Sequence, residues 1–206
     1  MNKCEIFRDE LNLITNYDIR EIVENCLNNA PDYFYEVPAS SSGKYHPKQD
    51  LGYMGLIRHT KTVVWCAIDL LRCEQFVKEN NDYKDVIVAS CLLHDIKTRI
   101  NNYDKYTTAK HPLLGSELFM KEVENTIDFL KSNGIADSEL DYLKKQCGRI
   151  SNCIKSHMGI WNRDYKTKEE ILPKPSTKLE VLVHLADYIA SRKYINMYDL
   201  DNNKIN

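Results

Sequence analysis

The stretch YKDVIVASCLLHDI, residues 83–96, constrains the fold more than any other part of the chain. It is almost entirely apolar, so a folded chain has to bury it. Its Val and Ile content would suit a strand, but no second run of this kind exists to pair with it, so we expect a buried helix. The stretch ends in His94 and Asp95. An unpaired carboxylate is costly in apolar surroundings, and a divalent cation would satisfy both side chains.

The rest of the chain has apolar residues at helical spacing, interrupted by polar segments. We expect further helices over residues 5–15, 18–29, 56–78, 111–132, 138–157 and 177 to about 193. The expected N-caps are Asn16 or Asp18, Asp137 or Ser138, and a capping box of Thr177 with Glu180. Residues 30–55 and 97–110 and the segment WNRDYKTKEEILPKPS are expected to be irregular. The predicted fold class is therefore all-α.

Composition limits the function classes. A chain of 206 residues is most simply one domain, 1–206. Its net charge of −2 has no basic excess, so we expect no duplex-DNA binding. The seven cysteines show no CxxC spacing, which favours reduced thiols over disulfides or a zinc knuckle. No signal-peptide core and no apolar run of about 20 residues is present, so we expect a cytoplasmic protein without a membrane partner.

Other candidate ligands are spread along the chain. His59, His111 and His157 fall near predicted helix termini or in helices beside them. Asp187 lies in the mainly apolar helix LVHLADYIASRK, where a salt bridge to Arg192 or Lys193 is the alternative to metal binding. His184 lies three residues before Asp187 and shares its helix face, either near the site or as a packed core histidine.

These residues occur in the order H…HD…H…H…D, within the pieces GLIRHT, CLLHDI, KHPLLGSELF, IKSHMGIW and VHLADYIASRK. The order resembles the HD-domain superfamily of metal-dependent phosphohydrolases, over roughly residues 51 to 193. HPLLGSE, SHMG and LADYIASRK are most similar to the branch of HD-type phosphodiesterases and 3′-exonucleases. PASSSGKYHP, leading into GLIRHT, resembles a segment of small bacterial and phage HD proteins.

The resemblance implies a helical bundle with a metal site at its centre. It implies an HD core over about 51–195, preceded by N-terminal helices and a substrate-facing loop over about 1–50. The implied ligands of a first ion are His59, His94, Asp95 and Asp187. His111 and His157 match the histidines that hold a second ion, with Asp95 bridging. Imidazole and carboxylate donors suit Mn, Fe, Ni, Co or Zn better than Mg, and one or two ions are expected.

One departure from the family pattern concerns the cation that contacts phosphate. Many two-metal members read HDxGK, whereas this chain reads HDIKTR, with Lys97 one place early, Thr98 at the lysine position and Arg99 after it. Lys97, Arg99 or Lys44 is expected to replace the missing lysine. Asp95, Lys97 and Lys44 are accordingly the candidate catalytic residues.

Lys44 belongs to the stretch VPASSSGKYHP, residues 37–47, which looks like a phosphate-binding loop. It is not a Walker A loop, because Pro38 stands where the first glycine is required and Tyr45 follows Lys44. We expect a loop at the mouth of the metal site, in which Lys44 and His46 contact substrate; a solvated linker is the alternative.

Two further side chains are candidate substrate contacts. Trp161 lies in a polar loop and is expected to stack on a nucleobase or to act as a hydrophobic lid. Arg192 is expected to contact a phosphate, with a surface ion pair as the alternative.

These expectations favour a metal-dependent phosphohydrolase that uses activated water on a phosphate ester of a nucleotide or short oligonucleotide. About 50 residues precede the HD core and they show helical spacing, so no oligonucleotide-binding barrel is expected, which favours a small substrate. The alternative is a non-catalytic module that senses nucleotides or binds a protein. Assembly into a homo-oligomer stays open.

Overall fold

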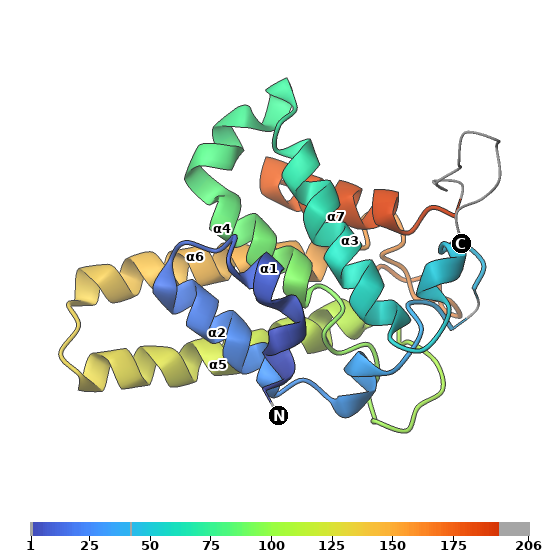
Figure 1. Cartoon of the computed structure of the whole chain (residues 1–206), viewed down its shortest axis with the longest axis horizontal. Coiled ribbons are helices and arrows are strands. Elements are labelled where there is room, and N and C mark those ends of the chain that lie inside the picture. The colour runs from blue at the N-terminus through green and yellow to red at the C-terminus, as the bar shows by residue number, and fades with distance from the viewer. Residues whose placement is uncertain (1, 42, 194–206) are drawn as a thin grey trace.

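The computed structural model describes residues 2–41 and 43–193, without the side chains of residues 77–82. The described chain consists of α-helices, short 3-10 helices (η) and loops (Figure 1). Within these ranges there is no β-strand, only an isolated bridge between Arg163 and Glu170. The elements in chain order are η1 (Lys3–Phe7), α1 (Arg8–Leu11), α2 (Tyr17–Asn28), η2 (Asp32–Tyr35), η3 (Lys48–Asp50), α3 (Gly55–Leu70), η4 (Glu74–Phe76), α4 (Val77–Leu93), α5 (His111–Ser132), α6 (Asp137–Ser156) and α7 (Lys178–Ala190). The predicted all-α class is confirmed.

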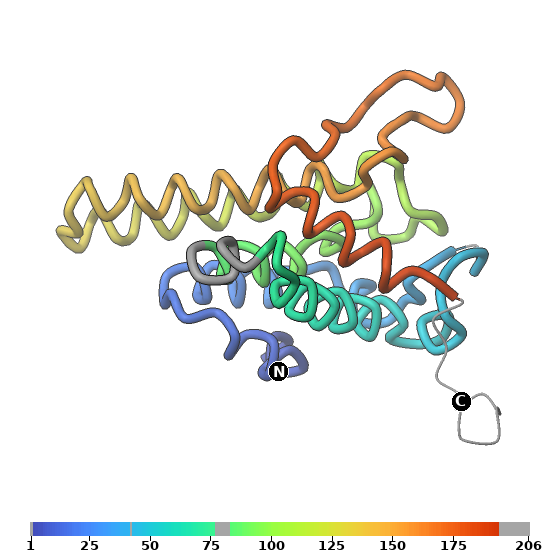
Figure 2. Tube along the Cα trace, turned by 90° about the horizontal axis from the view of Figure 1, so that it is seen from above, coloured from blue at the N-terminus to red at the C-terminus, as the bar shows by residue number. Residues whose placement is uncertain are grey.

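Helix α4 lies at the centre of the bundle and packs against α2, α3, α6 and α7. Its second half is completely buried, as the apolar sequence predicts, with Ile87, Leu92 and Leu93 among the largest fully buried side chains. Helices α5 and α6 run side by side as a long antiparallel pair, and α7 lies along α3 (Figures 1 and 2). The central helix therefore delivers its C-terminal residues, His94 and Asp95, to the middle of the molecule.

The N-terminal segment shares the same core. Phe7 and Phe34 are fully buried, with ring centroids 6.2 Å apart. Helix α2 packs against α4 and α5. One hydrophobic cluster therefore runs continuously from Cys4 to Ala190. The end of the expected HD core and the rest of the C-terminal stretch, residues 194–206, lie outside the described residues.

Several helix boundaries differ from those predicted. The expected helix 5–15 is a 3-10 turn followed by the one-turn α1. The expected helix 56–78 ends at Leu70, because the chain turns there and inserts Phe76 into the core. The expected helix 83–96 begins earlier, at Val77, and has non-helical backbone at Tyr83. The last helix ends at Ala190. Tertiary packing overrides local spacing at each of these positions.

The caps agree in part with the sequence. The side chain of Asn16 accepts a hydrogen bond from the Ile19 amide at 2.9 Å, as expected. Thr177 accepts from the Glu180 amide, but the Glu180 carboxylate accepts from the Ser176 amide, so only half of the capping box forms. Neither Asp137 nor Ser138 is the N-cap of α6; this position is taken by Ala136, without a side-chain hydrogen bond.

The structure bears on the expectations about the cysteines and about membrane-spanning helices. All seven cysteines lie within the described part and are free thiols. Among the described helices, none combines the length and the apolar character needed to cross a bilayer.

Gly55 allows a loop to dock on the first turn of α3. The Met54 and Leu56 amides donate to the carbonyls of Glu36 and Val37, both at 3.0 Å. A Cβ atom on Gly55 would lie 2.0 Å from the Asp50 carbonyl oxygen and 2.9 Å from Pro38 Cα. Only glycine permits this approach, which holds Pro38 and Asp50 against the start of α3, one turn before His59.

We expect Gly55→Ala to lower the free energy of unfolding by about 1–3 kcal/mol, because the added methyl group overpacks a closed backbone contact. The matched control is Gly148→Ala in α6, where a Cβ atom would meet nothing within 4 Å. We expect this control to raise stability by about 0.5–1 kcal/mol, because alanine favours the helix. Urea unfolding of both variants measures the difference, and equal effects would contradict the close docking at Gly55.

Candidate metal centre

The structure brings the six predicted ligands to one place. Four of them lie at helix ends or directly beyond them, where a polar side chain can leave the apolar face of its helix. The six candidate ligands come from five elements: His59 from α3, His94 and Asp95 from the end of α4, His111 from the start of α5, His157 from the end of α6 and Asp187 from α7.

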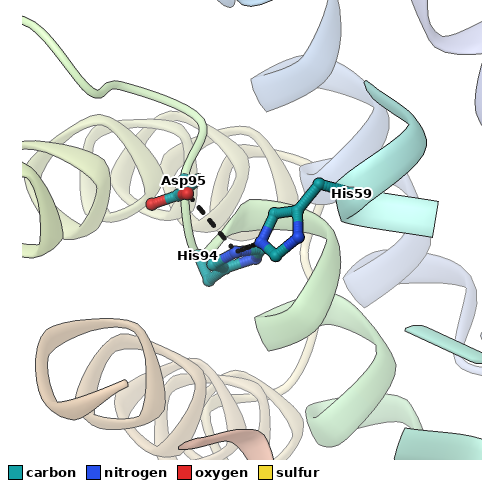
Figure 3. Close-up of side chains that lie close together, drawn as sticks. All are labelled: His59, His94 and Asp95. Carbon is teal, nitrogen blue, oxygen red and sulfur yellow. Dashed lines mark hydrogen bonds and ion pairs between the residues drawn. The ribbon is translucent and has the colours of Figure 1, made fainter. Parts of the chain in front are cut away.

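The first group of donors surrounds His94. His94 Nε2 lies 3.4 Å from His59 Nε2, 3.6 Å from Asp95 Oδ2 and 3.8 Å from Asp187 Oδ1. His59 Nε2 lies 3.1 Å from Asp187 Oδ1. Figure 3 shows the rings of His59 and His94 turned toward each other, with the Asp95 carboxylate beside them. These donors converge on one point between α3, α4 and α7.

The second group of donors shares Asp95. Asp95 Oδ1 lies 3.0 Å from His111 Nε2 and 3.6 Å from His157 Nε2, and the two imidazole nitrogens are 3.2 Å apart. Asp95 therefore presents one carboxylate oxygen to each group. The two groups of donors are therefore neighbours joined by this carboxylate.

Hydrogen bonds to backbone carbonyls define which ring nitrogen carries the hydrogen in three of the imidazoles. The Nδ1 atoms of His94, His111 and His157 lie 2.8, 2.9 and 2.7 Å from the carbonyl oxygens of Cys91, Thr108 and Ile154. A carbonyl oxygen only accepts, so each Nδ1 carries the hydrogen. In the neutral ring, Nε2 then has a lone pair that points into the cluster. This is the orientation of a metal-binding histidine.

The residues present fit a metal ion. An ion about 2.0–2.2 Å from each nitrogen or oxygen donor leaves neighbouring donors about 3.0–3.5 Å apart, close to the separations in both groups. Asp95 Oδ1 is buried and has no hydrogen-bond partner, although His111 Nε2 is 3.0 Å away. A cation between the donors would bind this oxygen and reduce the repulsion between its lone pairs and those of the imidazole Nε2 atoms. The buried His/Asp cluster could therefore hold a metal ion.

The electrostatics of the cluster favour ionised carboxylates. Burial opposes the charge of Asp95, but His94 and His111 outweigh it and hold its pKa well below the usual value. Burial also opposes the charge of Asp187, yet the hydrogen bond with His59 and the charge of His94 lower its pKa. Two ionised carboxylates are thus available as ligands without any change in protonation.

The imidazoles divide into two kinds. Burial lowers the pKa of His94, which favours the neutral form that binds metal. Burial acts in the same direction on His59 and His157, but the hydrogen bond with Asp187 raises the pKa of His59, and the negative charge of Asp95 raises the pKa of His157. Because a metal ion binds the neutral imidazole, its binding would release any proton held on Nε2 of His59 or His157.

Asp50 is a neighbour of the cluster that sequence reasoning missed. It is 1% exposed, and neither of its carboxylate oxygens has a hydrogen-bond partner. Burial raises its pKa, partly offset by the charge of His59. His59 Nδ1 is also buried and without a partner. Asp50 is the last residue of the short η3, in the sequence KQDLGY, and no pattern in the sequence distinguishes it.

A cavity of about 490 Å³ opens onto the cluster, with Asp95, His59, His111, His157 and Asp187 in its wall. Part of the expected loop lines it as well, through Ala39, Ser40, Ser41, Tyr45 and His46. Ser42 lies outside the described residues. The loop is tied to the end of α7, where the Lys193 amide donates to the Tyr45 carbonyl at 2.7 Å.

The four candidate cations differ in position. Arg192 lines the cavity. The Lys44 ammonium lies over the Tyr45 ring, 5.0 Å from its centroid. Arg99 lines a neighbouring cavity, and Lys97, two residues after Asp95, is half-buried. Among the described residues that line the metal cavity, Arg192 is the only Lys or Arg.

Aromatic side chains surround Arg192. Its guanidinium carbon lies 4.3 Å from the ring centroid of Tyr188, 5.4 Å from that of Tyr45 and 5.9 Å from that of Trp161. Trp161 and Tyr188 are stacked, with centroids 5.6 Å apart and an interplanar angle of 11°. The sequence singled out Trp161 and Arg192 but missed Tyr45 and Tyr188, because their proximity depends on how α7 meets the loop.

His184 supports the turn that carries His157. Its Nδ1 donates to the His157 carbonyl oxygen at 2.7 Å, so its half-buried side chain lies beside a candidate ligand and not in the core. Gly159 has a φ of +57°, and a Cβ atom there would lie 2.2 Å from His184 Cε1. The glycine in SHMG therefore makes room for the ring that fixes this turn.

Comparison of the chain with protein-family models, with curated proteins and with solved structures found no match.

We expect purified protein to contain about two transition-metal ions per chain. Asp95→Ala should lose both ions, because it removes the carboxylate shared by the two donor groups. His111→Ala should lose about one ion, because the donors around His94 stay intact. Asp128→Ala, an exposed change in α5, is the control for lost negative charge. Elemental analysis measures the ratios, and equal metal content in Asp95→Ala and the control would contradict the assignment.

Proposed function

We propose that the protein is a metal-dependent phosphohydrolase of the HD-domain type that cleaves a phosphate ester of a nucleotide or short oligonucleotide. The observation that carries this proposal is the position of Asp95, which offers one oxygen to each of two donor groups in the wall of a cavity. A metal that only stabilised the fold would need no such access, since structural sites are closed.

Divalent metal, when bound, would supply a water of lowered pKa and would polarise a phosphoryl oxygen. Under this proposal His59, His94, Asp95 and Asp187 hold one ion, and His111 and His157 hold the other with Asp95. The protein contributes neutral imidazoles and two carboxylates, so two dications would leave the site with net positive charge. Such a site attracts an anionic ester and requires no Ser or Cys nucleophile.

The aromatic wall supports a nucleotide as substrate. A nucleobase can stack on an exposed aromatic face, and Trp161 is half-exposed at the cavity while its ring is held against Tyr188. Arg192 is held among three rings, and its Nε donates to the Tyr188 carbonyl at 3.1 Å. This leaves a fixed cation at the cavity wall, suited to a phosphate oxygen.

The loop 37–47 contributes His46. Burial, together with the positive charge of His59, lowers the pKa of His46 to about 4, so the ring is neutral at physiological pH. Its Nδ1 atom is buried and has no hydrogen-bond partner. A neutral imidazole in the cavity wall can donate one hydrogen bond to a phosphate oxygen or a leaving group. Lys44 and Lys97 remain candidate cations for the same anion.

Turnover is the direct test of this proposal. We expect metal-loaded protein to hydrolyse at least one member of a panel of nucleotides, cyclic dinucleotides and short oligonucleotides. EDTA should abolish turnover, and added Mn²⁺ or another transition metal should restore it. If metal-loaded protein binds a nucleotide but hydrolyses no phosphate ester, the non-catalytic sensing or interaction module is the better interpretation.

Stacking by Trp161 is tested separately. We expect Trp161→Ala to raise KM for a nucleotide substrate about 5- to 100-fold, because stacking on one base contributes about 1–3 kcal/mol. Metal content should not change. Tyr165→Ala is the control, because Tyr165 is 83% exposed in the same loop and does not line the cavity. Equal steady-state kinetics for the two variants would refute a base contact at Trp161.

A further inference from the structure

A second cavity, of about 240 Å³, adjoins the metal cavity. Four residues belong to the walls of both: Ala39, Ser41, Tyr106 and Thr107. The two cavities are therefore neighbours that share one wall, built from Ala39 and Ser41 on one side and from Tyr106 and Thr107, between Asp95 and His111, on the other.

The second cavity is positively charged. Arg99 and Lys105 line it, and no Asp or Glu is among its lining residues. In the described part of the chain, neither cation lies within 4.0 Å of a carboxylate oxygen. Two cations without a carboxylate partner, together with the hydroxyl groups of Ser41 and Thr107, are the recognition chemistry of a phosphate.

Arg99 is held in place before any anion binds. Its backbone amide donates to the Tyr33 hydroxyl oxygen at 3.0 Å, and its guanidinium carbon lies 4.7 Å from the centroid of the same ring. A guanidinium that stacks on an aromatic ring keeps its N–H groups free to donate at its edge. Ordering this side chain thus adds little to the cost of binding an anion.

The loop that carries both cations is anchored to the metal ligands. The Thr108 amide donates to the Thr98 carbonyl at 2.9 Å and closes the loop. The Thr108 carbonyl accepts from His111 Nδ1 at 2.9 Å. Arg99 follows Asp95 by four residues. An anion in the second cavity would therefore be held at a defined distance from the metal cluster.

We propose that the second cavity is a subsite for a phosphate of the substrate other than the one that is cleaved. This inference rests on the proposed function. The phosphates of a nucleoside di- or triphosphate are joined by a single oxygen, so they would lie together in the metal cavity. Separate cavities suit phosphates separated by a sugar. The substrate is therefore a short oligonucleotide, cleaved at a phosphodiester next to a second phosphate.

Two dinucleotides that differ by one group test the subsite: pNpN, with a 5′-phosphate, and NpN, without it. Hydrolysis adds water and breaks one P–O bond of the internal diester in both. We expect metal-loaded wild-type protein to favour pNpN over NpN about 10- to 100-fold in kcat/KM, the range of one or two charge-assisted hydrogen bonds. In Lys105→Met and in Arg99→Met this ratio should fall toward one. Lys121→Met, an exposed change in α5, controls for net charge and should keep the wild-type ratio.

Calorimetric binding of the same dinucleotides to EDTA-treated protein gives a readout without turnover. The 5′-phosphate should raise the affinity of wild-type protein about tenfold or more, and both loop variants should lose this gain. Equal rates and equal affinities for pNpN and NpN in wild-type protein would overturn the subsite while leaving the phosphohydrolase intact. Failure to hydrolyse either dinucleotide, with a 5′-phosphate effect on binding, would count against the proposed function alone.

Discussion

Two partly buried carboxylates, those of Asp95 and Asp187, face the imidazole nitrogens of four histidines at the centre of the bundle, and the surrounding structure depends on this concentration of polar groups. Burying such charges is expensive unless each has partners. The donors are 3.0–3.8 Å apart across the cluster, and Asp95 Oδ1 still has no hydrogen-bond partner. A cation would resolve both conditions, and the bundle places four of the six candidate ligands at helix ends or directly beyond them.

The geometry of the helix ends explains how the ligands are aimed. His94, His111 and His157 each donate from Nδ1 to the carbonyl three residues earlier. For His94 and His157 these carbonyls belong to the last turn of a helix, where they lack intrahelical partners. One hydrogen bond therefore satisfies an orphan carbonyl, fixes the tautomer and directs Nε2 inward. The turn after His157 is fixed by a further hydrogen bond, from His184 to the His157 carbonyl, and Gly159 leaves space for the His184 ring.

The fold class and the pair His94 and Asp95 leave local signals in the sequence, whereas the full set of six candidate ligands was expected only from the order H…HD…H…H…D and the resemblance that it carries. The apolar run before His94 and Asp95 predicts a buried helix that ends in ligands, and the structure has α4 there. By contrast, the early end of α3 depends on Phe76 entering a core that forms from distant segments. Local spacing has no information about such packing.

Asp50 and part of the cavity walls were not accessible to sequence reasoning for the same reason. Asp50 becomes notable only because folding buries it without a hydrogen bond near His59. Tyr45 and Tyr188 are far apart in sequence, and they meet around Arg192 because the loop is tied to the end of α7. The positive second cavity likewise requires two loops to meet. Contacts of this kind arise from tertiary structure alone.

In the proposed site, Asp95 is shared between two metal ions. Crystals of Mn²⁺-loaded wild-type protein, with diffraction data that measure the anomalous signal of manganese, test it most directly. We expect two anomalous peaks, one on each side of the Asp95 carboxylate: the first beside His59, His94 and Asp187, and the second beside His111 and His157. A single peak, or no peak at the cluster in metal-replete protein, would contradict it.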